Sequence, residues 1–371
     1  MSGNEQANGI LPFQQLRQAI GASIIAAEND IEAAQVQPAS LDLRLCRDAW
    51  RVQASFLPGR GMSVTDKLEK FAMHRIDLSD GAVLERGCVY IVRLQESLCL
   101  PADVSAMANP KSSTGRLDIF TRLITDGAGE FEAVENGYEG PLYAEISPRT
   151  FSVLVRSGSR LSQLRLRRGP AMISDNAMQE LQKTTGLVHG SETPDIRDGV
   201  GLSVNLLPDE KSGMIGWRAR KNAGLIDIDA PCSCSVNAFW ERLTETDLVA
   251  GGLVLNPDEF YILASREFVT VPHGYAAEMR AYDTRVGEFR AHYAGFFDPG
   301  FGMEELGAGQ TRAVLEVRSH DVPFLIEQGQ TVCRLVYEPM AERPTALYGD
   351  ASSMSNYQSQ GLRLAKHFIQ H

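Results

Sequence analysis

The chain has 371 residues and a formal net charge of −11, with 43% hydrophobic and 22% charged residues. This length suggests more than one domain, and the composition excludes a disordered or collagen-like chain. No apolar run reaches the length of a membrane span, and the first residues lack the pattern of a secretory signal, so we expect a cytoplasmic protein. The acidic charge argues against general binding of nucleic acid, although a local cluster of basic residues would suit a small anion.

A few helical patterns alternate with many short strand patterns. Apolar residues recur at helical spacing from residue 10 to residue 27, and a capping Ser174 with Gly186 beyond predicts a short helix at 174–185. Runs rich in β-branched or aromatic residues, separated by Gly, Pro, Asn and Asp, predict strands at 88–94, 144–155, 312–318 and 331–337. Many short strands of this kind indicate an all-β sandwich or barrel.

Several landmarks recur at one fixed offset. Tyr90 and Tyr261 are 171 positions apart, and the same offset relates Glu145 to Glu316. Coincidence among short strands is the alternative, but we interpret the pattern as two copies of one β-rich unit. A polar stretch near residue 190 predicts the boundary, which gives units at 1–190 and 191–371. The shared offset also holds for Pro101 with Pro272, Gly158 with Gly329, and Leu164 with Leu335.

Residues 110–116, which read P-K-S-S-T-G-R, place hydroxyls and two cations around a glycine. Such groups suit phosphate oxygens, although the spacing is not that of a Walker A loop. Residues 292–302 combine small residues, which allow a base edge to approach the backbone, with Asp298, which can accept a hydrogen bond from a sugar hydroxyl. A polar turn is the alternative reading of each segment.

Glu145 and Glu316 both stand among apolar residues of predicted strands. If such a carboxyl points inward, loss of solvent raises its pKa and prepares it for general-base catalysis; if it points outward, it is an ordinary solvent-facing side chain. The spacing does not decide between these directions.

Common catalytic signatures are absent from the sequence. The zinc nucleobase-deaminase pattern is missing, because no His is followed two residues later by Glu and no P-C-x-x-C occurs. Neither G-x-S-x-G nor G-x-G-x-x-G is present. The six cysteines show no repeated C-x-x-C spacing and are expected to be reduced thiols.

Taken together, these segments resemble the dCTP deaminase and dUTPase family. Residues 38–45 are similar to the family's early A-x-x-D-x-R strand, and residues 111–116 are similar to the R-S-S-x-x-R motif of the deaminases. Residues 158–163 are similar to the G-x-R-x-x-Q element. Residues 294–302 are close to the A-x-x-x-D-P-G-[WFY]-x-G segment, and residues 356–361 are similar to the K-Y-x-x-Q tail that closes over the triphosphate.

The resemblance implies a mainly β fold of two tandem dUTPase-like, distorted, jelly-roll-like barrels with a few short helices. It implies zinc-independent hydrolytic deamination of dCTP to dUTP and ammonia, which supplies dUMP for thymidylate synthesis. Mg²⁺ would be bound with the nucleotide triphosphate, and no side chains would hold a metal of their own. The implied partners are dCTP or dUTP and further copies of the chain, as a trimer of two-barrel chains or a dimer, with no nucleic acid and no membrane.

The same resemblance assigns roles to individual residues. Glu316 falls where the deaminases carry their catalytic glutamate, with Arg116 and Ser112 near the attacked carbon, and Glu145 is the second candidate base. The substrate-binding residues that the resemblance implies are Lys111, Ser112, Ser113, Arg116, Ala294, Asp298, Tyr348, Tyr357 and Gln360.

Each repeat departs from the family pattern in a different half. In repeat one, residues 135–138 read E-N-G-Y where the family has D-P-G-W. In repeat two, Ala281 and Tyr282 stand in place of the two serines of the phosphate-side motif, and Asn356 replaces the tail lysine. Because the losses are complementary, we predict one main site that joins the phosphate side of repeat one to Asp298 and Glu316 of repeat two. The alternatives are a dUTP pyrophosphatase or a bifunctional enzyme, in which Asp298 activates water, and an inactive nucleotide-binding regulatory protein.

Overall fold

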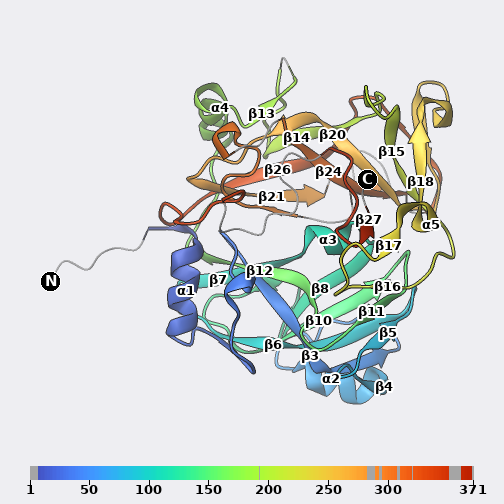
Figure 1. Cartoon of the computed structure of the whole chain (residues 1–371). Coiled ribbons are helices and arrows are strands. Elements are labelled where there is room, and N and C mark those ends of the chain that lie inside the picture. The colour runs from blue at the N-terminus through green and yellow to red at the C-terminus, as the bar shows by residue number, and fades with distance from the viewer. Residues whose placement is uncertain are drawn as a thin grey trace.

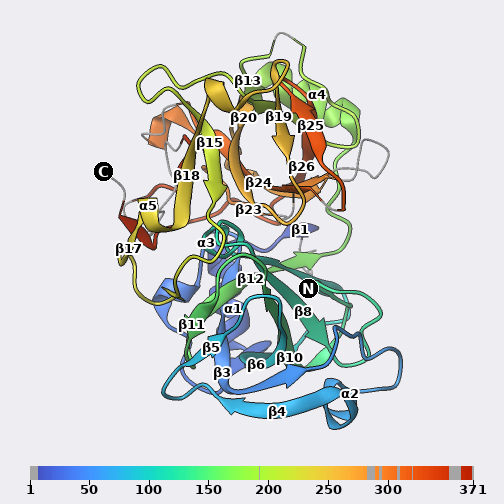
Figure 2. The ribbon, with the colours of Figure 1, turned by 90° about the vertical axis from the view of Figure 1, so that its right-hand side faces the viewer.

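A computed structural model describes residues 7–191, 193–281, 289–291, 295–306, 310–319, 321–350 and 361–369. The strands of this part of the chain form two ten-stranded sheets, accompanied by three small sheets. Figures 1 and 2 show two curled β lobes stacked on each other, with the N-terminal half in blue to green and the C-terminal half in yellow to red. The helices are short: α1 (Phe13–Gly21), α2 (Val64–Phe71), α3 (Ser112–Gly115), α4 (Asp175–Thr184) and α5 (Val236–Phe239). The predicted mainly β architecture of two tandem barrels is confirmed.

The first sheet belongs to repeat one. β1 (Gly9–Ile10), β2 (Ile25–Ala27) and β4 (Ala72–Asp77) pair with its longer strands from the side. The strand order is β8 (Ile119–Thr125), β10 (Glu139–Pro148), β6 (Val89–Cys99), β3 (Leu41–Val52), β12 (Arg160–Arg168), β7 (Val104–Pro110) and β9 (Ala133–Val134).

The second sheet belongs to repeat two. β13 (Val188–His189) and β24 (Arg312–Ser319) pair with β20, and β22 (Phe289–Ala291) pairs with β24. The strand order is β18 (Trp240–Thr244), β15 (Met214–Ala219), β20 (Tyr261–Val269), β14 (Val200–Asn205), β26 (Thr331–Pro339), β21 (Tyr275–Ala281) and β23 (Phe296–Phe297).

The three small sheets connect and close the lobes. β19 (Gly252–Leu255) pairs with β25 (Phe324–Glu327) inside repeat two. β17 (Cys234–Ser235) pairs in parallel with β27 (Phe368–Ile369) near the C-terminus. The third sheet crosses between the repeats, because β16 (Ile226–Asp227) of repeat two adds to β11 (Val153–Val155) and β5 (Ala82–Leu84) of repeat one.

Strand pairing reproduces the offset of 171. Glu145 lies opposite Ile91 in the first sheet, and Glu316 lies opposite Ile262 in the second. Both members of the second pair are 171 positions beyond those of the first, so the two units share their strand register as well as their sequence landmarks.

The repeated tyrosine has the same structural role in each unit. The buried Tyr90 hydroxyl accepts a hydrogen bond from the N–H of Glu85 at 3.0 Å, and the buried Tyr261 hydroxyl accepts one from the N–H of Asn256 at 3.1 Å. Glu85 and Asn256 are themselves 171 apart. The tyrosine therefore recurs because its hydroxyl satisfies a backbone donor in the turn before the strand.

Two predicted elements are shorter than expected. The helix predicted over 10–27 is only α1, because Ser23 takes a left-handed backbone with φ of 58° that ends the helix, and the chain continues as β2. The strand predicted over 144–155 divides into β10 and β11. Pro148, which has no N–H to donate, is the last residue of β10. The other predicted elements are confirmed as parts of β6, α4, β24 and β26.

The segment at the predicted boundary packs with repeat two. Met178 of α4 and the following Leu187 and Val188 lie in the hydrophobic core of the second sheet. A short loop therefore separates β12, the last strand of repeat one, from the first element in that core.

Aromatic packing fixes the two repeats against each other. Phe151 of repeat one packs edge-on against Trp240 of repeat two, with ring centroids 5.6 Å apart, and Phe368 packs on Trp240 at 5.9 Å. Phe151, Trp240 and Phe368 are each 1% exposed. Burial of such rings contributes roughly 2–3 kcal/mol each, so the interface between the repeats is a shared core that holds any site at the junction in place. No described helix is long and apolar enough to cross a membrane.

Candidate active site

A cavity of about 150 Å³ lies between the two repeats. Figure 2 shows α3, which provides part of its wall, at the junction of the lobes. The structure thus brings together, within one chain, the two halves that the sequence predicts to form the main site, while the catalytic role of each residue stays a prediction. The predicted residues that line the cavity are Lys111, Ser112, Ser113, Arg116, Asp298, Glu316 and Tyr348.

The phosphate-side segment folds as a single helical turn. Lys111 has an extended backbone and begins α3, and its carbonyl accepts a hydrogen bond from the Thr114 N–H at 2.8 Å. The Thr114 hydroxyl donates to the carbonyl of Leu161 in β12 at 2.8 Å, which ties the turn to the sheet. This turn places Ser112 on the cavity wall and ends at Arg116.

Glu316 is a buried carboxyl that faces a buried cation. It lies in β24, is 7% exposed, and its Oε1 is 4.0 Å from Nε of Arg116, which is 2% exposed. Burial raises the pKa of Glu316 to about 8, an effect that Arg116 opposes and the nearby Asp118 reinforces. Arg116 is itself oriented by donating a hydrogen bond to the carbonyl of Arg363 at 2.9 Å. A carboxyl held in this state can exchange a proton near neutral pH.

A second buried pair supports this one and was not predicted from the sequence. Nε of Arg318 is 3.3 Å from Oδ2 of Asp118, with side chains 7% and 0% exposed. Oδ2 of Asp118 also accepts a hydrogen bond from the Thr150 hydroxyl at 2.5 Å. Arg318 follows Glu316 by two residues in one strand, so both side chains point to the same face, and strand alternation is the signal that identifies Arg318.

Asp298 is held from across the interface. It follows β23, is 8% exposed, and its Oδ1 accepts a hydrogen bond from Nη2 of Arg165 in β12 at 3.0 Å. Arg165 also donates to the carbonyl of Ala277 at 3.1 Å and lies 4.0 Å over the ring of Phe296. Burial raises the pKa of Asp298, and Arg165 opposes the rise. No spacing in the sequence indicates Arg165, because its partner Asp298 lies in the other repeat.

The turn after Asp298 requires glycine. Gly300 has φ of 98°, and a Cβ there would lie 2.8 Å from the Leu306 side chain and 2.9 Å from the Tyr348 carbonyl oxygen. The Tyr348 N–H donates to the Pro299 carbonyl at 2.8 Å, which places this tyrosine beside the cavity. The close approach explains why a D-P-G sequence stands here.

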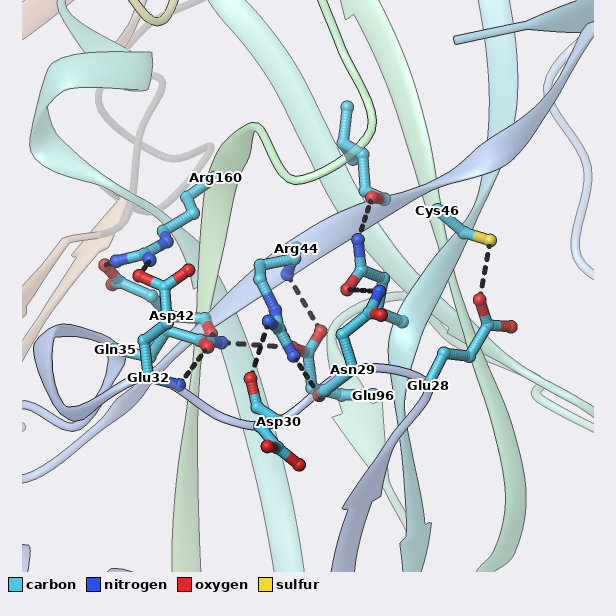
Figure 3. A network of polar contacts seen from close by, with 12 residues as sticks. Glu28, Asn29, Asp30, Glu32, Gln35, Asp42, Arg44, Cys46, Glu96 and Arg160 are labelled. Atoms are coloured by element: carbon cyan, nitrogen blue, oxygen red, sulfur yellow. Dashed lines mark hydrogen bonds and ion pairs between the residues drawn. The ribbon is translucent and has the colours of Figure 1, made fainter. Parts of the chain in front are cut away.

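Lys111 is paired with an acid from the early strand of repeat one. Its ammonium forms an ion pair with Asp42, which is 2% exposed, and Nη1 of Arg160 is 4.0 Å from the same carboxylate. Figure 3 shows Arg160 pointing toward both Asp42 and Glu32. Gln35 donates to the Asp42 carbonyl at 3.0 Å and so fixes this part of β3. The cationic side of the cavity is thereby held in place by carboxylates of the same repeat.

Glu145, the second candidate base, does not line the cavity. It is 1% exposed and forms an ion pair with Arg122, the residue directly opposite it on β8. The Arg122 guanidinium lies 3.8 Å over the ring of Phe131. In repeat one the position that matches Glu316 is therefore occupied by a buried carboxylate that is paired with a cation of the same repeat.

Three predicted binding residues, Ala294, Tyr357 and Gln360, lie outside the described residues. Within the described ranges, no three His, Cys, Asp or Glu side chains gather closely enough to hold a metal ion.

The fold and the cavity define a class of protein, namely a tandem β-barrel protein in which cations and a buried carboxyl converge on one pocket. Two family models match consecutive parts of the chain: the N-terminal domain of 2'-deoxycytidine 5'-triphosphate deaminase (DCD) over residues 7–170, and the C-terminal domain over residues 174–368. The chain belongs to this deaminase family.

Individual relatives agree with the family model. The crystal structure of 2'-deoxycytidine 5'-triphosphate deaminase from Agrobacterium tumefaciens is 54% identical, covers 91% of this chain and 99% of its own, and superposes with a TM-score of 0.85. A "dCTP deaminase, dUMP-forming" from Methanobrevibacter smithii is 32% identical over 110 residues, which are 29% of this chain and 53% of the relative. A dCTP deaminase from Halorubrum lacusprofundi is 31% identical over 150 residues, 40% of this chain and 70% of that one. This chain thus spans about half the length of the first of these two curated relatives.

Proposed function

We propose that this chain is a hydrolase of cyclic-amidine C–N bonds that deaminates dCTP to dUTP and ammonia. The observation that carries the proposal is the buried Glu316 carboxyl, with its pKa raised to about 8, 4.0 Å from Arg116 in a cavity between the repeats. The names of the relatives support the substrate, because the proteins from Agrobacterium tumefaciens and Methanobrevibacter smithii are both called dCTP deaminases.

Glu316 acts as the acid–base group of this reaction. In its ionised form it takes a proton from water as the water oxygen bonds to C4 of cytosine, and it passes this proton to N3. Glu316 then takes the remaining proton of the new C4 hydroxyl and delivers it to the amine, so the C4–N bond breaks, ammonia leaves, and the oxygen remains as O4 of uracil. One positioned acid–base group supplies about 10²–10⁴-fold in rate. Arg116 and Ser112 stabilise the charge that develops at the attacked carbon.

The rest of the cavity orients the nucleotide. Asp298, held by Arg165 through one oxygen, accepts a hydrogen bond from the sugar 3′-hydroxyl with the other. Lys111 and the hydroxyls of Ser112 and Ser113 bind phosphate oxygens, and Mg²⁺ arrives with the triphosphate as part of the substrate. Ala294 offers backbone groups to the base, and Tyr348, Tyr357 and Gln360 close over the phosphates.

A second candidate activity is cleavage of dUTP to dUMP, alone or after deamination. It is favoured by relatives that are named dUMP-forming dCTP deaminases. In that reaction Asp298 would activate a water molecule against the α-phosphate. Release of pyrophosphate distinguishes this activity from deamination.

One assay separates these functions. Purified protein is incubated with dCTP or dUTP and Mg²⁺ while ammonia and pyrophosphate are followed. Ammonia without pyrophosphate supports the proposal, and both products from dCTP indicate a bifunctional enzyme. Pyrophosphate from dUTP without ammonia from dCTP indicates a pyrophosphatase, and neither product, with nucleotide bound in calorimetry, indicates a regulatory protein. A zinc chelator is expected to leave the rate unchanged.

We also propose a cytoplasmic homo-oligomer, either a trimer of two-barrel chains or a dimer. A trimer would give six barrels in a closed arrangement. Light scattering after size-exclusion chromatography measures the mass of the assembly, and a mass near that of one 40.7 kDa chain would contradict this part of the proposal.

A further inference from the structure

A second cavity of about 350 Å³ adjoins the candidate active site. The two cavities have five lining residues in common, so they form one continuous space that extends beyond Lys111 and away from Glu316. The shared residues are Gln37, Asp42, Lys111, Ser113 and Lys366.

Lys366 differs from the other cations in the wall of the second cavity. Lys111 is paired with Asp42, and Arg160 donates to Glu32 at 2.6 Å, whereas the Lys366 ammonium forms no ion pair with any residue that the structure describes. Burial, and then the charge of Lys111, lower the pKa of the half-buried Lys366. Asp42 and Asp229, which line the same cavity, oppose this shift. A bound anion would balance the charge of Lys366, which has no ion-pair partner among the described residues.

The backbone around Lys366 is fixed before any ligand binds. The Lys366 carbonyl accepts a hydrogen bond from the Cys232 N–H at 3.0 Å, and the neighbouring His367 ring is bonded to the Ile228 carbonyl at 2.9 Å. Phe368 is buried in the shared core, and Figure 1 shows β27 beside β17 at the junction of the lobes. Lys366 therefore extends from an anchored segment, which lowers the entropy lost when its side chain binds an anion.

We propose that Lys366 binds the terminal phosphates of the nucleoside triphosphate and makes the site select triphosphates over monophosphates. The inference rests on the proposed function, since it takes the base and sugar to lie between Glu316 and Asp298. The phosphate next to the sugar then lies at Lys111, and the following phosphates enter the second cavity, where Lys366 and Arg160 face them. A monophosphate carries no further phosphate into the second cavity, so it gains less from Lys366.

The test compares Lys366→Met with the unmodified enzyme. We expect KM for dCTP to rise about tenfold to hundredfold, the range for loss of one charge-assisted hydrogen bond, with kcat little changed. The kcat/KM for dCMP stays the same, so the preference for dCTP over dCMP falls by the same factor. Lys366→Arg keeps the charge and recovers most of the affinity. Lys183→Met removes the same charge from exposed α4 and leaves every constant unchanged.

Calorimetry with inorganic tripolyphosphate gives a readout that does not depend on turnover. Weaker tripolyphosphate binding by Lys366→Met supports the inference, provided that its thermal unfolding matches that of the unmodified protein. This result would support the role of Lys366 even if the protein did not deaminate dCTP; only the proposed function would then fail. Unchanged tripolyphosphate affinity and unchanged KM for dCTP in Lys366→Met overturn the inference while leaving deamination intact. Equal loss of affinity in Lys366→Met and Lys366→Arg also contradicts it.

Discussion

Replacing Glu316 with Gln is the sharpest perturbation that the structure offers. Gln has nearly the volume of Glu and can keep its hydrogen bonds, but it cannot accept the proton of a water molecule. Glu316 is 7% exposed and lies 4.0 Å from Arg116, with its pKa raised to about 8. Loss of one acid–base group lowers kcat about 10²–10⁴-fold, or roughly 3–5 kcal/mol in the activation barrier. We expect KM for dCTP to change little, because the proposed sugar and phosphate contacts remain.

Glu145→Gln is the matched control for this experiment. Glu145 is also buried and stands 171 positions earlier, but it is paired with Arg122 and does not line the cavity. Release of ammonia from dCTP is measured for both variants under saturating substrate. The reasoning predicts that Glu145→Gln stays within a few-fold of the unmodified enzyme. Full activity in Glu316→Gln together with loss of activity in Glu145→Gln would refute it.

Two further predictions concern stability. The pKa of Glu316 rises from 4.5 to about 8 on folding, so the stability that its protonated carboxyl provides is present at low pH and is lost as the pH rises toward 8. The free energy of unfolding of Glu316→Gln should therefore rise, relative to wild type, by on the order of 4 kcal/mol between pH 4.5 and pH 8. A stability difference between the two proteins that stays constant over this pH range would contradict this. Gly300→Ala should lower the free energy of unfolding by about 1–3 kcal/mol and raise KM for dCTP, because its Cβ would meet the Tyr348 backbone; an unchanged free energy of unfolding would show that the turn relaxes.

The repeat and its motifs were predictable because they depend on local sequence. Tyr90 and Tyr261 recur since each hydroxyl satisfies a backbone donor in its own turn, and Glu145 and Glu316 recur at matched strand positions. The left-handed Ser23, which ends α1 early, could not be read from the apolar spacing, because that spacing continues beyond it.

The supporting contacts of the site depend on how the two repeats dock. Arg165 holds Asp298 across the interface, and Asp118 of repeat one pairs with Arg318 of repeat two. Strand alternation places Arg318 on the same face as Glu316, but no pattern within either repeat indicates that it pairs with Asp118 or that Arg165 pairs with Asp298. The direction of the glutamates was likewise undecided from the sequence, and the structure shows both to be buried, one beside a cavity and one against Arg122.

The central claim is that one chain supplies both halves of its own active site. Arg116→Met breaks the repeat-one half and Glu316→Gln breaks the repeat-two half, so the two variants can be co-expressed with different tags and purified as hybrid assemblies. We predict that ammonia release from dCTP by the hybrids is no greater than by either variant alone, because every chain carries one broken half. Recovery toward about a third of wild-type activity in a hybrid trimer, or about a half in a hybrid dimer, would contradict the account, since it would require a site that is shared between chains.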